Sequence, residues 1–273
     1  MKKTLLAVAL CCLPYLMVAQ NKIETSKETL NSSKSDDDDN DSGNEIDEES
    51  IEGTLFFAFV DYVLMVGYWG AVGYYDEEPH LSRNVLTHHP YQYTETGNYY
   101  RPFEGDSLVK DAFRFDVKNK FLYGYGALYG NHLEAKIRPW RYFYFTTDYY
   151  QILEKQIGEN THDNLSVFYF NFAYDRIRLE RFNLGWTLGA GFVGSGVNRA
   201  GISYGLNAEY FFKKRISLAA GATFSHINKE RVHAYEAEIK RHSKNFFLSL
   251  GFEHLEIAGP NYNFVSLGAG FYF

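Results

Sequence analysis

The chain has 273 residues and a formal net charge of −7, and it is rich in aromatic residues, with 23 Tyr and 23 Phe, as well as 23 Gly. The negative charge argues against a basic nucleic-acid-binding protein, so no nucleic acid is expected among its partners. Only two Cys are present, which excludes a disulfide-rich scaffold. The mean hydropathy of −0.34 argues against a protein with several apolar helical spans.

Residues 1–19 have the pattern of a secretory signal peptide. The basic pair Lys2–Lys3 precedes an apolar stretch over Leu5–Val18, and we expect cleavage within Ala19–Gln20. This junction resembles the signal peptides of the Bacteroidota. A lipid-modified cysteine at Cys11–Cys12 is the alternative, but the bulky leucine before this pair disfavours it. Removal of the signal peptide leaves a chain without thiol chemistry, which suits an oxidising compartment.

Residues 20–53 are predicted to form a disordered acidic tether. The stretch is of low complexity, repels itself and offers too little apolar surface to fold. The spacing of Asp37, Asp39 and Asp41 is similar to that of a calcium-binding loop. Ser42 stands where such a loop needs glycine, so a solvated charge run is the preferred interpretation.

Residues 54–110 are predicted to form a periplasmic segment. The apolar stretch Leu55–Val66 suggests a short amphipathic helix at the membrane interface or against the barrel, with an extra strand as the alternative. The part that follows is polar and rich in tyrosine. His80, His88 and His89 could contribute to a metal site, but no fourth ligand is evident nearby, and no metal or other cofactor is predicted.

From residue 111 to residue 273 the hydrophobic period is two. Between Ile202 and Phe212, apolar residues alternate with Ser203, Gly205 and Asn207, and the same alternation recurs in the other segments. This pattern is typical of β-strands with one apolar and one polar face. The segments expected to be strands are, approximately, 112–124, 129–138, 142–152, 164–175, 182–193, 200–212, 215–226, 232–240, 245–256 and 262–273.

Two kinds of fold produce this alternation, a soluble β-sandwich and a membrane β-barrel with its apolar face outward. The signal peptide and the Gly, Ser, Asn and charged residues of the polar face favour the barrel. The last strand, which ends on Phe271, Tyr272 and Phe273, resembles the signal by which outer-membrane β-barrel proteins of Gram-negative bacteria are recognised for assembly. We therefore predict an all-β protein, an antiparallel transmembrane β-barrel of about ten strands over residues 111–273.

The predicted turns fall into two alternating classes. One class is basic, and counting back from a periplasmic C-terminus puts it on the periplasmic side, where it would meet anionic phospholipid head groups. The turns of the other class, such as 194–200 and 258–262, are richer in Gly and Asn and are expected to face outward. The basic residues are Arg138, Arg141, Arg176, Arg178, Arg181, Lys213, Lys214, Arg215, Lys240, Arg241 and Lys244.

The polar face of the strands is expected to line the lumen. Charges in a small barrel must find partners, so we expect them to pair and fill the interior, with a narrow channel as the alternative. The predicted lumen-facing residues are Arg114, Asp116, Glu134, Lys136, Asn207, Glu209 and Glu253.

No catalytic residues are predicted. The strand number resembles that of the omptin surface proteases, but His162–Asp163 has no facing pair of acidic residues in the sequence. A lipid-modifying enzyme would need a nucleophile such as Ser195 or Ser203 with a base such as His226, and nothing in the sequence joins them. An outer-membrane enzyme is therefore the least favoured function.

The sequence favours a non-enzymatic protein of the outer membrane, with its N-terminal tether in the periplasm. Its expected role is that of a structural component or accessory subunit of an envelope complex, and a narrow channel for small solutes or ions is the alternative. Expected partners are outer-membrane lipid and lipopolysaccharide, the barrel-assembly machinery and an envelope protein.

Overall fold

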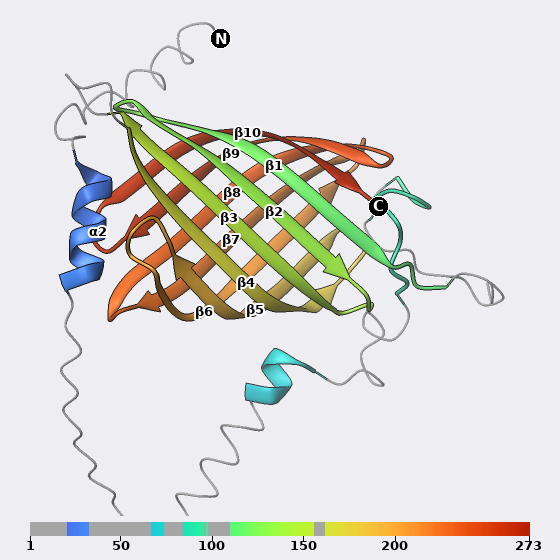
Figure 1. Ribbon diagram of the computed structural model, residues 1–273. Coiled ribbons are helices and arrows are strands. Elements are labelled where there is room, and N and C mark those ends of the chain that lie inside the picture. The colour runs from blue at the N-terminus through green and yellow to red at the C-terminus, as the bar shows by residue number, and fades with distance from the viewer. Residues whose placement is uncertain (1–20, 33–66, 74–83, 96, 98–109, 156–161) are drawn as a thin grey trace, which may run out of the picture.

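The ten segments with a period of two form the ten strands of a closed antiparallel barrel. The computed structural model describes residues 21–32, 67–73, 84–95, 97, 110–155 and 162–273 (Figure 1). The strands are β1 (Arg114–Gly124), β2 (Leu128–Arg138), β3 (Phe143–Lys155), β4 (His162–Arg178), β5 (Phe182–Val193), β6 (Arg199–Phe212), β7 (Ile216–Ile227), β8 (Glu230–Ser243), β9 (Phe246–Ile257) and β10 (Asn261–Tyr272).

Each strand pairs with its neighbours in sequence, and β1 pairs with β10 to close the barrel. At the closing seam, Phe115 and Phe273 exchange backbone hydrogen bonds of 3.0 and 2.8 Å. Closure leaves no unpaired edge, which is the condition for β-structure in a bilayer. The predicted fold class and strand number are therefore confirmed, and the sandwich is excluded. Among the described residues, no helix is long and apolar enough to span a bilayer.

The alternation of the strands sorts the side chains into an outer and an inner set. Leu206, Ile202 and Leu267 are 58, 70 and 65% exposed on the outer face, while Asn207 and Ser203 lie on the inner face. An outer band of apolar side chains can be buried only by lipid, since nothing in the described structure covers it.

The two ends of the barrel are distinguished here by their connections. The α2 rim carries the connections β1–β2, β3–β4, β5–β6, β7–β8 and β9–β10, and the terminus rim carries the start of β1, the end of β10 and the remaining turns. Figure 1 shows helix α2 at the first rim and the C-terminus at the second.

Helix α2 (Lys22–Ser32) covers the rim named after it. Ile23, Ser26 and Leu30 recur at helical spacing and are buried. This helix lies within residues 20–53, for which the sequence predicted an unstructured tether. The prediction treated residues 20–53 as one acidic segment and missed the short amphipathic helix at its start. Only two apolar side chains, Ile23 and Leu30, mark the buried face of that helix.

Two further segments lie near the terminus rim. Residues 67–71 are helical, and the backbone of this stretch meets the outside of β4 and β5, where Trp186 donates to the carbonyl of Ala71 at 3.0 Å. Tyr174 donates to the carbonyl of Val72 at 2.7 Å. The stretch Leu55–Val66, for which an amphipathic helix was predicted, lies outside the described residues.

Residues 84–95 cover the interior at the terminus rim. Tyr91 is buried, and its hydroxyl donates to the carbonyls of Phe212 and Ile216 at 2.8 and 2.6 Å. Burial, and then the negative charge of Glu209, raise the pKa of the Tyr91 phenol, so the hydroxyl stays a donor. His88 and His89, considered above as metal ligands, belong to this segment, and His80 lies outside the described residues.

Candidate functional site in the barrel lumen

The middle of the barrel contains a layer of charged side chains, called here the charged layer. Its members come from alternate positions of the strands, because every second residue of a strand points inward. Most of them are buried. The charged layer consists of Lys118 and Lys120 on β1, His132, Glu134 and Lys136 on β2, Asp148 on β3, Glu236, Glu238 and Lys240 on β8, and Glu253 on β9.

Ion pairs of the charged layer cross the lumen. The Lys118 Nζ lies 2.7 Å from Glu238 Oε1 and 2.9 Å from Glu134 Oε2. The Lys120 Nζ lies 2.7 Å from Glu236 Oε2 and also pairs with Glu253. Two strands, β10 and β9, separate β1 from β8 in the barrel wall. The pairs therefore run as chords through the interior and occupy the space that a channel would need.

His132 joins two carboxylates on different strands. Its Nδ1 lies 3.0 Å from Glu253 Oε2, and its Nε2 lies 3.2 Å from Asp148 Oδ1. The ring also stacks on Tyr150, with 3.8 Å between the ring centroids. With both nitrogens facing carboxylates, only the imidazolium form donates to both at once. His132 therefore adds a fifth cation, beside four lysines, to a layer in which carboxylates are abundant.

The structure places the predicted lumen residues in the interior, mostly in pairs. Arg114 Nε lies 2.9 Å from Asp116 Oδ1, and Lys136 Nζ lies 3.1 Å from Glu134 Oε1. The remaining three are also held: Glu209 lies 3.3 Å from Lys240, Asn207 accepts from Tyr144 at 3.4 Å, and Glu253 contacts Lys120 and His132.

The three residues of the predicted assembly signal do not share one face. Phe271 and Phe273 are exposed on the outer face. Tyr272 points inward, where its hydroxyl lies 2.9 Å from Nδ1 of His242 and its ring stacks on that imidazole. The terminal strand thus presents a lipid-facing edge and an interior anchor in alternation.

Several basic residues expected at head groups are inside the barrel instead. Arg138 Nη1 lies 2.9 Å from Asp175 Oδ2, and its guanidinium lies 3.8 Å from the ring of Tyr144. Arg178 is fully buried, with its guanidinium 4.1 Å from the ring of Tyr142. The expectation that these arginines meet phospholipid was wrong, because at these strand ends the inward-facing positions carry the charge.

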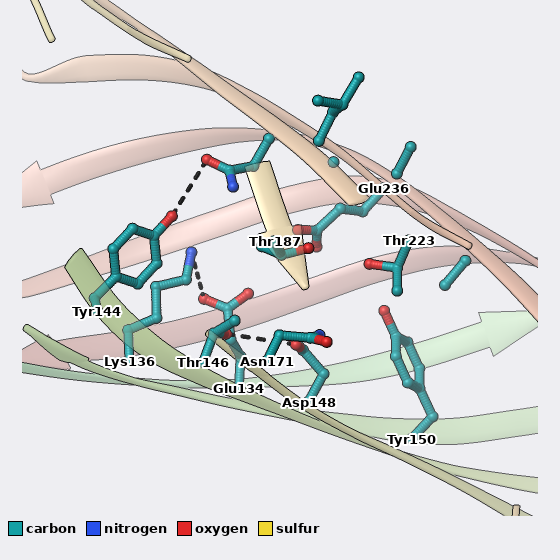
Figure 2. A pocket seen from close by; sticks show the side chains of 15 residues that line it. Glu134, Lys136, Tyr144, Thr146, Asp148, Tyr150, Asn171, Thr187, Thr223 and Glu236 are labelled. Carbon is teal, nitrogen blue, oxygen red and sulfur yellow. Dashed lines mark hydrogen bonds and ion pairs between the residues drawn. The ribbon is translucent and has the colours of Figure 1, made fainter. Parts of the chain in front are cut away.

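A small cavity remains beside the charged layer. It has a volume of about 50 Å³ and is lined by Glu134, Lys136, Asp148, Asn207 and Thr223, among others (Figure 2). Figure 2 shows Lys136 directed at Glu134. The hydroxyl of Tyr144 donates to Oδ1 of Asn207 at 3.4 Å. A water molecule needs roughly 10–15 Å³ of such space, so the cavity has room for a few water molecules.

Two groups of the described side chains have the spacing of metal ligands, His132 with Glu134 and Asp148, and His132 with Glu236 and Glu253. Lys118 and Lys120 already place ammonium groups against these carboxylates. The positive charge that a metal ion would supply comes from lysine, so the donor set fits an internal ion-pair network better than a metal centre.

The structure does not assemble the catalytic groups considered above. Ser203 is buried in the lumen and donates to Asn171. His226 follows Ser225, which is also buried in the lumen, so alternation turns the imidazole to the outer face. Ser195 contacts Ser166 at 3.1 Å in the β5–β6 connection. His162 is exposed where β4 begins.

Three members of the site were missed by sequence reasoning. Lys120 continues the inward face of β1 beyond Lys118, but the aromatic run that follows it obscures the period. Asp148 lies in a strand in which Thr and Tyr occupy both faces, so alternation is weak. Lys240 was expected in a basic turn at head groups, but it is buried and lies 3.4 Å from Glu238 in the charged layer.

Comparison with known proteins finds similar solved structures but no family. No family model matches the chain, and no curated protein matches it. Solved structures do match. The NanC porin is 10% identical over 57% of this chain and 98% of its own, with a TM-score of 0.37. An outer membrane channel from Pseudomonas putida F1 is 10% identical over 63% of this chain and all of its own, with a TM-score of 0.35. The attachment invasion locus protein of Yersinia pestis is 15% identical over 59% and 96%, with a TM-score of 0.28. The chain forms a closed antiparallel β-barrel of ten strands with an apolar outer face.

Proposed function

We propose that this protein is a non-enzymatic, closed outer-membrane β-barrel that acts as a structural or accessory subunit of the envelope. The observation that carries the proposal is the set of ion pairs that cross the lumen between β1 and β8. A barrel whose interior is bridged by buried, paired charges has a fixed filling, and this favours a scaffold over a transport path.

The covers at the two rims also support a closed state. Helix α2 buries Ile23 and Leu30 at one rim, and Tyr91 is buried at the other, where its ring packs on Phe211 and His242. A scaffold function needs such closure, because an unregulated opening would let solutes leak across the membrane.

The orientation that we propose puts the terminus rim in the periplasm, as the resemblance of the last strand to an assembly signal implies. Helix α2 then lies on the outer side, since it covers the opposite rim. The sequence had predicted both outward-facing turns at this rim and a periplasmic tether. For residues 22–32, which contact those turns, the two predictions are incompatible.

Envelope partners follow from this orientation as proposals. The outer apolar band would contact membrane lipid, the outer turns lipopolysaccharide, and the barrel-assembly machinery would insert the strands. A further envelope protein would bind a surface outside the bilayer. The similarity of the signal sequence to those of the Bacteroidota remains a prediction from residues 19–20.

Ion conductance in planar bilayers tests the proposal. We expect the purified full chain to show no steady conductance across the range of potentials at which porins stay open. A stable open pore would reject the closed scaffold and support the second candidate, a narrow channel for small solutes or ions. The observation that favours this second candidate is the water-sized cavity beside Asp148 and Asn207.

A further inference from the structure

The lumen at the α2 rim is apolar, in contrast to the charged layer. We call this region the apolar mouth. Inward-facing residues of several strands form it together with the two apolar residues of α2, Ile23 and Leu30. On the barrel side it includes Leu122, Ile152, Val232, Leu255, Ile257 and Tyr262.

An apolar interior is unusual for a membrane barrel, in which the lumen is normally polar. Without α2 the apolar mouth would be a hydrophobic cup open toward water. Such a surface needs an occupant, because exposed contiguous apolar surface is unfavourable. In the structure the occupant is α2, which contributes only Ile23 and Leu30 as apolar side chains.

One carboxylate lies within the apolar mouth. Glu154 is 2% exposed, and its Oε2 accepts a hydrogen bond of 3.0 Å from the backbone N–H of Ile23. Its second oxygen, Oε1, is buried without a hydrogen-bond partner. A buried carboxylate at the first turn of a helix is stabilised by the positive end of the helix dipole. The N-terminus of α2 thus acts as a partial cation opposite Glu154.

Lys22, the residue before Ile23 in α2, carries a full positive charge. The Lys22 ammonium donates to the carbonyl of Asn261 at 2.8 Å and lies 6.0 Å from the centroid of the Tyr262 ring. Aromatic faces attract ammonium groups at such distances. The N-terminal end of α2 therefore presents to the mouth what a cationic amphiphile presents, a positive head joined to an apolar body.

We propose that the apolar mouth is a binding site for a cationic amphiphile with a single alkyl chain, which competes with α2. The ammonium head of the ligand pairs with Glu154, including its unpartnered oxygen, and lies against Tyr262. The alkyl chain replaces Ile23 and Leu30 among the residues of the apolar mouth. Glu154 makes the site selective, because an anionic head would meet a buried like charge.

The competition is open to a direct test, because the only cysteines of the chain, Cys11 and Cys12, lie in the predicted signal peptide. Ser26 is fully buried, and its hydroxyl donates to the carbonyl of Ile257 at 2.8 Å. A Ser26→Cys variant of the processed chain in phosphatidylcholine vesicles should react slowly with a maleimide. Thr25→Cys is the matched control, because Thr25 is exposed one residue earlier on the same helix.

The probe is dodecylammonium, with dodecanol and dodecyl sulfate as the uncharged and anionic comparisons. At saturation, dodecylammonium should raise the labelling rate of Ser26→Cys by about tenfold, the change expected when a ligand moves a seated helix toward release. The two comparison amphiphiles should have little effect at equal concentration in the membrane. The rate at Thr25→Cys should stay constant with all three.

Two further variants keep the outcome decisive. Glu154→Gln should shift the half-effective dodecylammonium concentration upward by about tenfold, since the charge that selects the head is lost. Val232→Cys places the reporter on the barrel side of the apolar mouth, where it is fully buried, and keeps α2 unchanged. An equal response to all three amphiphiles, or an unchanged response in Glu154→Gln, would overturn the site.

Discussion

The apolar mouth and the charged layer close the same lumen by different physical means. The mouth is filled by a helix that comes from outside the barrel, held by hydrophobic contacts and a few hydrogen bonds. The charged layer is filled by the strands themselves, through ion pairs that span the interior. The first closure can be removed without touching the wall, whereas the second cannot, because its components also build the wall.

Because of this difference, the stability of the barrel and the exposure of the apolar mouth should depend on different residues. Loss of one partner in a buried ion pair leaves an uncompensated charge, which is strongly destabilising. Loss of α2 exposes the apolar mouth but leaves the pairing of all strands in place. We therefore expect variants in the charged layer to affect unfolding of the barrel, and variants at α2 to affect mainly the exposure of the mouth.

The largest effect is expected from Lys118→Met. Glu134 and Glu238 would lose their closest cation, and the free energy of unfolding should fall by about 3–5 kcal/mol. Urea titration of the barrel, followed by the gel shift between heated and unheated samples, measures this loss. Lys213→Met is the control, because Lys213 is exposed in the β6–β7 turn and should change stability by no more than about 0.5 kcal/mol.

The outer wall gives a reference for these interior effects. Leu206→Arg should reduce the free energy of unfolding by roughly 2–4 kcal/mol if this exposed residue lies near the bilayer midplane. Asn207→Arg should be milder, because Asn207 lines the cavity beside Glu134 and Glu236, where a guanidinium finds carboxylates. The opposite order in unfolding titrations would show that the inner and outer faces have been exchanged.

A smaller effect is expected from Glu154→Gln in the absence of any ligand. The amide keeps an acceptor for the Ile23 N–H but removes the charge at the first turn of α2, which weakens seating by about 0.5–1 kcal/mol. Faster maleimide labelling of Leu30→Cys, which is fully buried in the wild-type helix, would report this change. Barrel unfolding should not move, and a parallel loss of barrel stability would contradict a separable mouth.

The smallest effect is expected on conductance when residues 21–32 are deleted. Removal of α2 opens the apolar mouth, but the ion pairs of Lys118 and Lys120 still cross the lumen below it. Planar bilayer recordings of the deletion variant should therefore match those of the full chain. A steady current that appears only after the deletion would mean that α2 is the sole barrier.

A further measurement tests which rim of the barrel faces outward in the membrane. Thr25→Cys on α2 should react with a membrane-impermeant maleimide in intact cells, whereas Lys213→Cys at the terminus rim should react only after permeabilisation. The reverse result would place the apolar mouth in the periplasm and the terminus rim outside.

The barrel was predictable from the sequence because its period is local. Segments such as 200–212 alternate without interruption, and the observed strand Arg199–Phe212 differs from the prediction by one residue at its start. The lumen residues followed from the same rule, since alternate positions share a face. The alternation predicts which side chains point inward, but it does not predict which of them pair. Lys118 pairs with Glu238, a residue 120 positions later in the sequence.

Helix α2 was not predictable by the same means. Ile23, Ser26 and Leu30 carry its buried face, and a pattern of so few positions beside an acidic run gives a weak signal. The helix is stabilised by the mouth, not by its own sequence, because an isolated helix of this length is marginal in water. The inward positions of Leu122 and Leu255 were equally hard to predict. An apolar side chain is not expected in a polar lumen unless a segment such as α2 packs on it.

The hydrogen bond between Ser26 and Tyr262 joins residues 236 positions apart, which bears on the order in which the molecule assembles. The seat of α2 is built from inward-facing residues of nearly all strands, including the last two, so it does not exist until the C-terminal hairpin has paired. The entropy of closing so long a loop grows only with the logarithm of its length, and it delays the contact more than it weakens it. Seating of α2 is therefore expected to be the final kinetic phase of folding, slower than closure of the β1–β10 seam.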